Sequence, residues 1–522
     1  MNSKISFRLL GLLLSGLLLN GLGAQTPGTL DTQFGTGGIA QASFQTFPSE
    51  CRAIALQNDG KIILGGQYTG SGKGYMGFAR FNTNGTLDNS FGTGGKSSPY
   101  NNTSVTVAAI QVLPDSKIIA AGTINNQPGI IRMTSAGALD NTFGTGGVVT
   151  FDASMSGIVD LKVLDNGKMI GCGIADQGSG KLFAAFRLNA NGTADNTFDG
   201  DGYAYANIGS QPTVTRLAVQ SDGKIVLTGT VFSNATKYDM VLFRFNSNGT
   251  PDNTFGTNGL VTTVLSTSSA YEQGNAVAIQ WGDNKILVAG RITNITPPVF
   301  AVVRYNTNGT VDNTFGTSGV TKINFNNASV EEAAKAIAFQ SDGKIIVAGS
   351  FATAASREFA LARLNKNGTV DNTFGASGKV STLIGTKAWG EALAIQSNGK
   401  IVVGGYALVN NLSQFAVARY NAGTIVGTAE AGAGIGALEV YPNPVFAGEK
   451  VNLRLDLDHS QICRIQWLAT DGRLLQADAG RELPAGDQTL SIEVPAGLPA
   501  GQVLLNLETE SGTGTRTVLI RR

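Results

Sequence analysis

One motif of nine residues recurs along most of this chain and limits the folds open to it. Its clearest copy, NGTVDNTFG, spans residues 308–316. Seven copies each place one aspartate at the same point, and these are Asp31, Asp88, Asp140, Asp195, Asp252, Asp312 and Asp371. Successive aspartates are 52 to 60 residues apart, and a period of that size is typical of a β-propeller or a solenoid. The motif therefore predicts a repeat array.

Each repeat also contains a hairpin and two further strands. Two short apolar runs flank an Asn-Gly or Asp-Gly pair, for example across residues 392–403, with looser versions at residues 115–116 and 283–284. Both central residues of a type I′ turn need positive φ, so these pairs predict a type I′ hairpin. A strand ending in Arg and a short strand after the motif complete the repeat. Seven repeats of four strands predict an all-β, seven-bladed propeller over residues 25–423.

An arginine stands eight residues before most of the repeated aspartates. The six pairs are Arg80 and Asp88, Arg132 and Asp140, Arg187 and Asp195, Arg244 and Asp252, Arg304 and Asp312, and Arg363 and Asp371. Asp31 at the beginning and Arg419 at the end are left over, and we predict that they form a seventh ion pair. The strand around residues 38–44 would then complete the last blade beside residues 391–420 and close the ring.

The first strand of each hairpin is expected to line the propeller axis. Its positions eight and six before the turn lysine are mostly alanine, which allows neighbouring blades to pack closely. The polar exceptions are Gln111, Asp160, Lys162 and Arg216. They belong to neighbouring blades, so we expect them on one side of the channel. They would form a polar pocket for a small or carbohydrate-like ligand, or an ion pair between Asp160 and Arg216 surrounded by water.

Further candidate ligand-binding residues precede the inner strands, where loops should converge at one mouth of the channel. They are Glu272, Glu331, Glu332, Trp389, Tyr271 and Glu391. The carboxylates could serve as the acid and base of a polysaccharide hydrolase or lyase, or form a solvated rim without catalytic function. Trp389 and Tyr271 could stack on the face of a sugar.

Histidine and cysteine are too scarce for several kinds of site. The one histidine is His459, so neither a Ser-His-Asp nor a Cys-His arrangement is expected within the repeats. The cysteines, Cys51, Cys172 and Cys463, are scattered and predict buried thiols rather than a zinc site or a disulfide framework. The Asn- and Asp-rich turns superficially resemble Ca²⁺ loops, but an Arg beside each Asp would repel the cation. We expect no metal and no cofactor.

Composition and charge exclude two classes of partner. The chain is Gly-rich, with 69 glycines, and only 14% of its residues are charged. Its 38 basic and 37 acidic side chains nearly cancel, which gives no general attraction to nucleic acid or to anionic membranes. We expect a monomer.

The beginning of the chain has the form of a secretory signal. Lys4 and Arg8 precede an apolar run over residues 9–19, and small residues follow up to Ala24. We predict a signal peptide over residues 1–24. No later stretch is apolar enough for a membrane-spanning helix, so we expect an exported chain without a transmembrane segment.

Two resemblances follow from these motifs. The TLDNTFG-like segment, DGKI-like turn and ARxN-like strand, found from Leu30 to Asn421, resemble the Delta-60 repeat, a family without a shared reaction. After an Ala- and Gly-rich linker, residues 424–437, the segments YPNP at 441–444, DGRLL at 471–475, LPAGQVL at 498–504 and the basic end at 521–522 come in order. Residues 438–522 thereby look like a type A sorting domain of the type IX secretion system. The resemblance implies a small β-sandwich that the secretion machinery recognises and that directs export from a Gram-negative bacterium.

These observations predict a secreted or cell-surface propeller that acts as a binding or scaffold module for a glycan or protein ligand. Two alternatives stay open. One is a carbohydrate-active enzyme that uses carboxylates at the channel mouth, and the other is a structural surface-layer protein without a discrete site.

Overall fold

The computed structural model describes residues 26–522 except 103, 152–154, 165, 179, 267–270, 281–282, 294, 341, 397, 424–434, 442–444, 458, 470–472, 479, 499–500, 510–511 and 522. The predicted signal peptide, residues 1–24, and most of the predicted linker, residues 424–437, lie outside the described residues. The same is true of parts of the motifs that resemble a sorting domain. Among the described residues, no helix has the length and hydropathy needed to cross a membrane.

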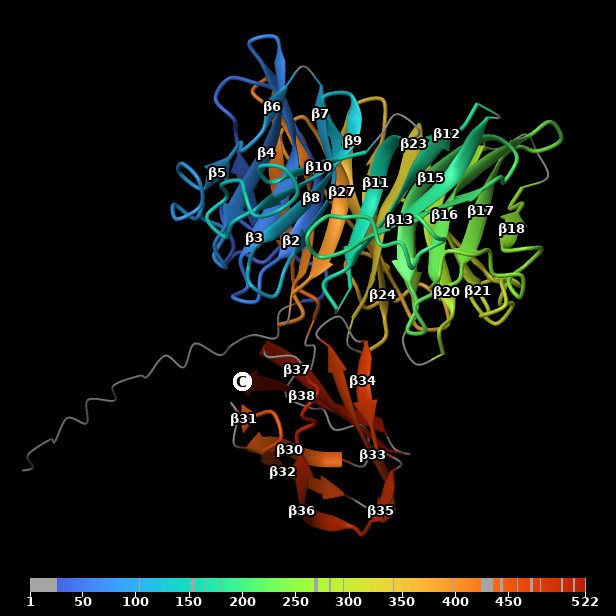
Figure 1. The fold of residues 1–522 in the computed structure, drawn as a ribbon. Helices are drawn as coiled ribbons and strands as arrows, with labels where there is room; N and C mark the ends of the chain where they lie inside the picture. The colour runs from blue at the N-terminus through green and yellow to red at the C-terminus, as the bar shows by residue number, and fades with distance from the viewer. Residues whose placement is uncertain are drawn as a thin grey trace, which may run out of the picture.

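Most of the chain folds into seven blades of antiparallel strands, and this confirms the predicted fold class (Figure 1). Blade 1 contains β2 (Ser49–Leu56), β3 (Ile62–Gly70), β4 (Lys73–Phe81), β5 (Lys96–Ser97) and the short β6 (Asn101–Asn102). Blade 2 contains β7 (Val105–Val112), β8 (Ile118–Ile124), β9 (Gln127–Met133) and β10 (Val148–Thr150). Blade 3 contains β11 (Met155–Val163), β12 (Met169–Asp176), β13 (Lys181–Leu188) and β14 (Tyr203–Ala206).

The next three blades repeat this order of strands. Blade 4 contains β15 (Ser210–Val219), β16 (Ile225–Ser233), β17 (Lys237–Phe245) and β18 (Leu260–Thr263). Blade 5 contains β19 (Tyr271–Ile279), β20 (Ile286–Thr293), β21 (Val299–Tyr305) and β22 (Val320–Ile323). Blade 6 contains β23 (Glu331–Phe339), β24 (Ile345–Ala352), β25 (Arg357–Leu364) and β26 (Lys379–Thr382).

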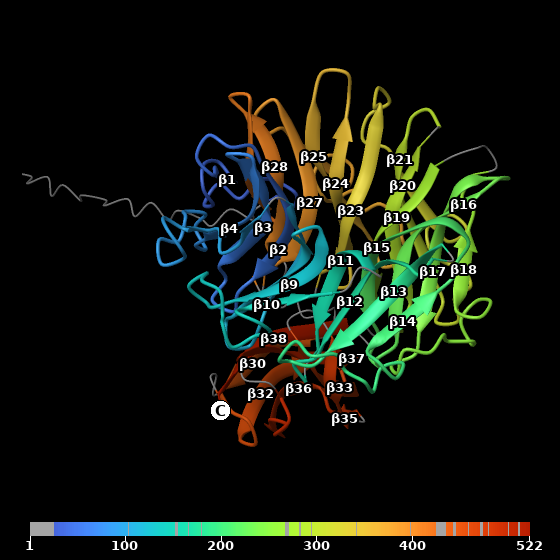
Figure 2. The ribbon, with the colours of Figure 1, turned by 45° about the horizontal axis from the view of Figure 1, so that its top comes forward.

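Blade 7 is built from both ends of the array. It contains β27 (Lys387–Ile395), β28 (Ile401–Val409), β29 (Leu412–Tyr420) and, from the N-terminal side, β1 (Ile39–Ala42). Strand β1 pairs antiparallel with β29, and Figure 2 shows it beside the orange strands of this blade. Arg419 Nε lies 2.8 Å from Asp31 Oδ2, so the predicted seventh ion pair is present. The ring is therefore closed by the N-terminal strand.

The fully described hairpin turns, in blades 1, 2 and 4, share one conformation, which differs from the predicted type. The Gly60 N–H donates to Gln57 O at 2.9 Å, and only Gly60, at 81°, has positive φ within the Asp59-Gly60 pair. A type I turn followed by one left-handed residue thus replaces the predicted type I′ turn. The left-handed position is filled by Gly60, Ser116, Gly167, Gly223, Asn284, Gly343 and Gly399.

Each blade is joined to the next by a repeated cluster that we call the latch: the motif aspartate, the arginine before it and the turn lysine. In blade 5, Asp312 Oδ2 accepts from Arg304 Nε and from Lys285 Nζ, both at 2.7 Å. Its other oxygen accepts from the hydroxyl of Thr314 at 2.7 Å. Arg304 Nη1 donates to the carbonyl of Lys366 in the next blade at 2.7 Å. Each latch thereby connects a buried ion pair to the neighbouring blade.

The seven latches repeat with little variation. The Arg Nε to Asp Oδ2 distances are 2.5 to 2.8 Å. The Lys Nζ to Asp Oδ2 distances are 2.7 to 3.4 Å. Burial alone would raise the pKa of Asp312, but hydrogen bonds from Lys285 and Thr314 and the charge of Arg304 lower it well below its usual range. The ionised aspartate is therefore the form that the fold stabilises.

The C-terminal strands form a separate β-sandwich, drawn in red in Figure 1. One sheet contains β30 (Ile435–Tyr441), β32 (Lys450–Leu457) and β36 (Gly486–Glu493). The other contains β31 (Val445–Phe446), β38 (Gly512–Arg521), β37 (Gly501–Thr509), β33 (Gln461–Ala469), β34 (Leu474–Ala477) and β35 (Arg481–Leu483). Leu453, Trp467 and Leu505 from the two sheets are at most 3% exposed and share one apolar core. The predicted sandwich is present. Cys463 lies in the same core, and Cys51 and Cys172 are free and buried in the propeller, as predicted.

Candidate ligand site in the axial channel

Every inner strand carries a β-bulge near its middle. In blade 1 the register against the second strand shifts between Cys51 and Ala53, and the other six blades show the same shift. A bulge leaves one extra residue unpaired and changes the direction of nearby side chains. The extra residues are Arg52, Ala108, Val159, Thr215, Asn275, Lys335 and Glu391, which we call the bulge belt. The belt lies where the channel is lined by all seven blades.

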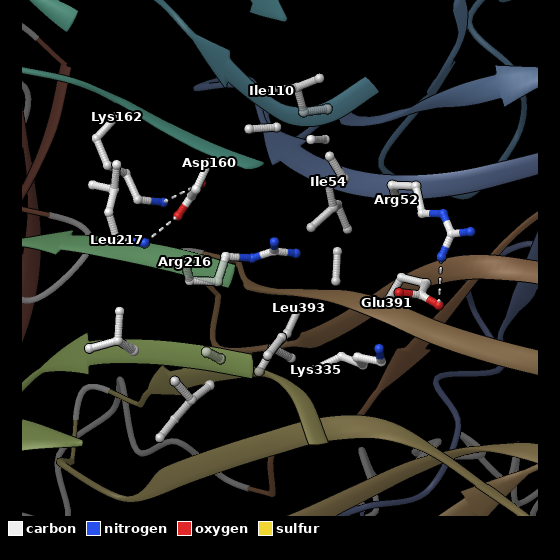
Figure 3. Close-up of a pocket in the computed structure, with 18 of the residues that line it drawn as sticks. Arg52, Ile54, Ile110, Asp160, Lys162, Arg216, Leu217, Lys335, Glu391 and Leu393 are labelled. Carbon is white, nitrogen blue, oxygen red and sulfur yellow. Dashed lines mark hydrogen bonds and ion pairs between the residues drawn. The ribbon is translucent and has the colours of Figure 1, made fainter. Parts of the chain in front are cut away.

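A cavity of about 160 Å³ lies in the channel beside the bulge belt (Figure 3). Its polar and charged lining residues are Arg52, Gln111, Asp160, Lys162, Arg216, Lys335 and Glu391. Alanines such as Ala276 and Ala336 leave room between them. The four candidates predicted from the alanine exceptions, Gln111, Asp160, Lys162 and Arg216, therefore all line one cavity.

Asp160 and Arg216 do not form the ion pair that the sequence suggested as one interpretation. Asp160 is 5% exposed, and its oxygens accept from the backbone N–H groups of Leu161 at 2.9 Å and Leu217 at 3.1 Å. Arg216 Nη1 donates instead to the carbonyl of Thr215 at 2.9 Å. Asp160 thus connects blade 3 to the backbone of blade 4, and Figure 3 shows Arg216 extending into the cavity.

The opposite side of the cavity carries charges from blades 6, 7 and 1. Arg52 lies between two carboxylates, with Nη1 3.2 Å from Glu391 Oε1 and Nη2 2.7 Å from Glu50 Oε2. Burial lowers the pKa of Lys335; Glu391 opposes this shift, whereas the charges of Arg291, Arg216 and Arg52 add to it. Arg291, Arg216 and Arg52 therefore lie close enough to Lys335 to disfavour its charged form.

Glu272 and Glu332 do not lie at a solvated rim, and this corrects the prediction. They are 1% and 0% exposed, and neither lines the cavity. Glu272 Oε2 accepts from the Leu265 N–H at 2.7 Å, and Glu332 Oε1 accepts from the Phe325 N–H at 3.0 Å. Burial is the largest effect on both groups and raises the pKa of each. These carboxylates therefore satisfy the backbone of the chain that leads into blades 5 and 6. Glu331 differs, because it pairs with Arg357 and its side chain is 41% exposed.

The two candidate aromatic residues are already engaged by protein side chains. Trp389 stacks on Tyr406 with ring centroids 4.8 Å apart, and the guanidinium of Arg357 lies 5.4 Å from the Trp389 centroid. Tyr271 contacts Tyr238 at 4.5 Å, and the guanidinium of Arg291 lies 5.0 Å from its centroid. Both rings therefore contribute to contacts between strands. Tyr271 also lines a second cavity with Tyr238, and the stacking on a sugar stays a prediction.

Sequence reasoning missed two of the channel cations, Arg52 and Lys335. Each stands nine residues before its turn lysine, a position that strict alternation places on the other face of the strand from the alanines. Because of the bulge, three consecutive residues, Arg52, Ala53 and Ile54, line the cavity in blade 1. A comparison of this position across the repeats would have shown charged side chains in blades 1, 6 and 7 alone.

Among the described residues, no group of three or more His, Cys, Asp or Glu side chains is placed to hold a metal ion. The oxygens of the Asn-rich turns are used within the turns themselves. Asn84 Oδ1, for example, accepts from the backbone N–H of Thr86 at 3.1 Å and from its hydroxyl at 2.8 Å.

Comparison with solved structures finds weak similarity to several proteins. A fungal alcohol oxidase of the AA5 family in complex with copper is 13% identical, with a TM-score of 0.42, covering 93% of this chain and 99% of that one. The polysaccharide lyase Uly1 is 11% identical, with a TM-score of 0.43, covering 71% and 90%. Sqt1 from Chaetomium thermophilum is 9% identical, with a TM-score of 0.39, covering 72% and 97%. Similarity at this level says nothing about ligands. No curated protein sequence matches the chain.

Seven segments match the family described as a domain of unknown function (DUF5122) beta-propeller: residues 57–91, 113–143, 164–198, 220–255, 282–315, 340–374 and 396–423. Each of the first six runs from the hairpin turn to the phenylalanine of the motif. The seventh stops before any motif, because the motif of blade 7 comes from the N-terminal side of the chain. The chain is therefore a seven-bladed β-propeller whose repeats match the DUF5122 family seven times.

Proposed function

We propose that the protein is an exported binding module that takes its ligand in the axial channel. The observation that carries the proposal is the departure of the channel residues from the repeat. The latch is the same in all seven blades, whereas the residues that line the cavity differ from blade to blade. Residues that only hold the fold together are the same in every repeat, so positions that depart from the repeat are candidates for function.

Binding is favoured over catalysis by the state of the carboxylates. Glycoside cleavage uses two carboxylates on either side of the reacting bond, one of them a proton donor. Glu272 and Glu332 are buried against backbone N–H groups. In the cavity, Glu391 is paired with Arg52, and Asp160 accepts two backbone N–H groups. Among the described residues of the channel, no carboxylate pair is thus free for this chemistry.

Export is proposed to depend on the two ends of the chain. Residues 1–24 would direct the first membrane crossing, and residues 438–522 would act as the sorting domain recognised by the type IX machinery. The mature protein would then reside on the cell surface or in the medium of a Gram-negative bacterium. The resemblance of the C-terminal motifs supports this proposal, together with the compact sandwich that the C-terminal residues form. A chain lacking residues 438–522 should accumulate in the periplasm, and secretion of that truncated chain would contradict the proposal.

Blocking the channel tests the binding function. Gln111 lines the cavity from β7, so Gln111→Trp should fill the space and abolish binding of any ligand found by a thermal-shift screen of glycans, peptides and small acids. Gln127→Trp is the matched control, because Gln127 is an exposed residue of β9 in the same blade. Binding that survives Gln111→Trp would overturn the assignment of the site to the channel.

A further inference from the structure

Two cations of the channel lack the carboxylate partners that their neighbours have. Arg52 is paired with Glu391 and Glu50, and Lys162 Nζ lies 3.9 Å from Asp160. Arg216 and Lys335, in contrast, have no carboxylate within 4.0 Å among the described residues. The side chains come from blades 4 and 6, on either side of blade 5.

Blade 5 leaves space between these two cations. It contributes Ala276 and Val277 to the cavity wall, whereas its bulge residue Asn275 is turned away to donate to the carbonyl of Ala334 at 2.7 Å. The sector between Arg216 and Lys335 is therefore lined by short apolar side chains. A cation in a confined channel pays a desolvation cost unless an anion accompanies it, so the arrangement favours a counter-ion from solution.

We propose that this sector binds a small oxyanion, a carboxylate or phosphate group, between the guanidinium of Arg216 and the ammonium of Lys335. The inference rests on the proposed function and names the ligand class of the same site. The guanidinium presents parallel N–H donors that match two oxygens of such a group, and the ammonium adds a point charge. Among the described residues, only Nη1 of Arg216 has protein acceptors, the carbonyls of Thr215 and Val159, so its remaining N–H groups are available to a ligand.

The surroundings limit what the site accepts. Asp160 and Glu391 also line the cavity and oppose a large negative charge. A cavity of about 160 Å³ has room for a small acid or for the acidic end of a longer molecule, but not for a folded protein segment. The expected ligands are therefore small and carry one or two negative charges.

Calorimetric titration of the full chain tests the inference. The probes are inorganic phosphate, glucuronate and glucose, the last two being sugars that differ by one carboxylate. Phosphate and glucuronate should bind saturably and glucose should not. Arg216→Met and Lys335→Met should each weaken anion binding at least tenfold, whereas Lys73→Met, at an exposed residue of β4, should leave it unchanged. A phosphate-terminated and a uronate-terminated oligosaccharide, compared with the free ions, would distinguish a free anion from the end of a chain.

The outcomes separate the two proposals. If glucose or a peptide binds and Gln111→Trp abolishes that binding, but anions do not bind, the channel function stands and the oxyanion inference fails. If no probe and no ligand from the screen binds, both fail. Equal anion affinity for the native chain, Arg216→Met and Lys335→Met, with each variant folded by circular dichroism, would also overturn the inference.

Discussion

The latch and the bulge belt occupy the same blades but use charge in opposite ways. In each latch, one aspartate is shared by an arginine and a lysine, and the guanidinium also bonds to the next blade. In the bulge belt, only Arg52 and Glu391 pair with one another, and Lys335 has no such partner among the described residues. The latch charges stabilise the ring because they are compensated. The uncompensated channel charges have no comparable structural benefit, and this difference is the reason to look for function there.

The neutral residues of the belt sharpen the contrast. Thr215 donates to the carbonyl of Gly274 at 2.6 Å, and Asn275 donates to that of Ala334 at 2.7 Å. In blades 4 and 5 the bulge residue therefore ties one inner strand to the next. A small polar side chain suffices for that purpose, so the charges in blades 1, 6 and 7 exceed what packing needs.

Acid should produce the largest change in stability, through the latches. The pKa values of Asp88, Asp140, Asp195, Asp252, Asp312 and Asp371 are all lowered from 3.8 in the fold. The unfolded chain therefore binds protons first, so the latch stabilisation is complete above pH 3.8 and is lost as pH falls below it. Between pH 5 and pH 3 we expect Tm to fall by on the order of 5–10 °C, measured by calorimetry.

Glu272 and Glu332 should act in the opposite direction. Their pKa values are raised from 4.5, so protonation stabilises the fold as pH falls towards that value. Tm should thus pass through a maximum near pH 5 before the latches fail. A Tm that stays constant down to pH 3 would contradict the assigned role of the latch.

Removing one latch arginine should be the next largest effect. Arg244 and Asp252 have side chains only 5% and 4% exposed, so Arg244→Met leaves a buried carboxylate with Lys224 alone. We expect a loss of about 3 kcal/mol in the free energy of unfolding, measured by urea denaturation. Arg132→Met is the matched comparison and should cost less, because the Arg132 side chain is 12% exposed. Equal effects at the two sites would mean that burial does not set the cost.

Removing a latch lysine should cost less again. Lys344 Nζ lies 2.8 Å from Asp371 Oδ2, but the lysine side chain is 30% exposed and Arg363 remains in place. Lys344→Met should lower the free energy of unfolding by about 1 kcal/mol, measured in the same urea experiment. A loss as large as that of Arg244→Met would show that the lysine contributes as much to the stability of the latch as the arginine does.

The fold could be predicted because its signals are local and repeated. The motif, the hairpin turn and the Arg to Asp spacing fixed seven blades, and the leftover Asp31 and Arg419 indicated how the ring closes. The type of turn could not be predicted. An Asp-Gly pair fits both the type I′ turn and a type I turn followed by one left-handed glycine, and the observed choice depends on the length of the loop.

The site could be predicted only where alternation along the strand holds. Gln111, Asp160, Lys162 and Arg216 replace alanine at positions that face the channel, so they were visible. The bulges turn Arg52 and Lys335 towards the channel. Sequence periodicity cannot reveal such an extra residue, because its position depends on how the strand pairs with its neighbour. Glu272 and Glu332 were misplaced for a related reason: each is the second residue of its strand, and its carboxylate turns back to a preceding N–H group.

The smallest expected effect has the opposite sign from those of the latch. Burial and neighbouring cations lower the pKa of Lys335 from 10.5, so at neutral pH its charged form is disfavoured by the fold. Glu391 offsets part of this cost, whereas Arg52, Arg216 and Arg291 add to it. Lys335→Met should therefore stabilise the chain by about 0.5–1 kcal/mol at pH 7. A gain of this size is typical when a residue that serves function at the expense of stability is replaced.

Lys344→Met provides the control for this prediction, because the same substitution in the same blade removes a compensated charge and should destabilise. The gain for Lys335→Met should shrink as pH rises towards 10.5, because Lys335 then loses its charge and burying it no longer costs stability. Added phosphate should stabilise the native chain and not Lys335→Met, since a ligand that binds only the folded state raises its stability. If both substitutions destabilise equally, the channel charges are structural like those of the latch, and the contrast between the two regions disappears.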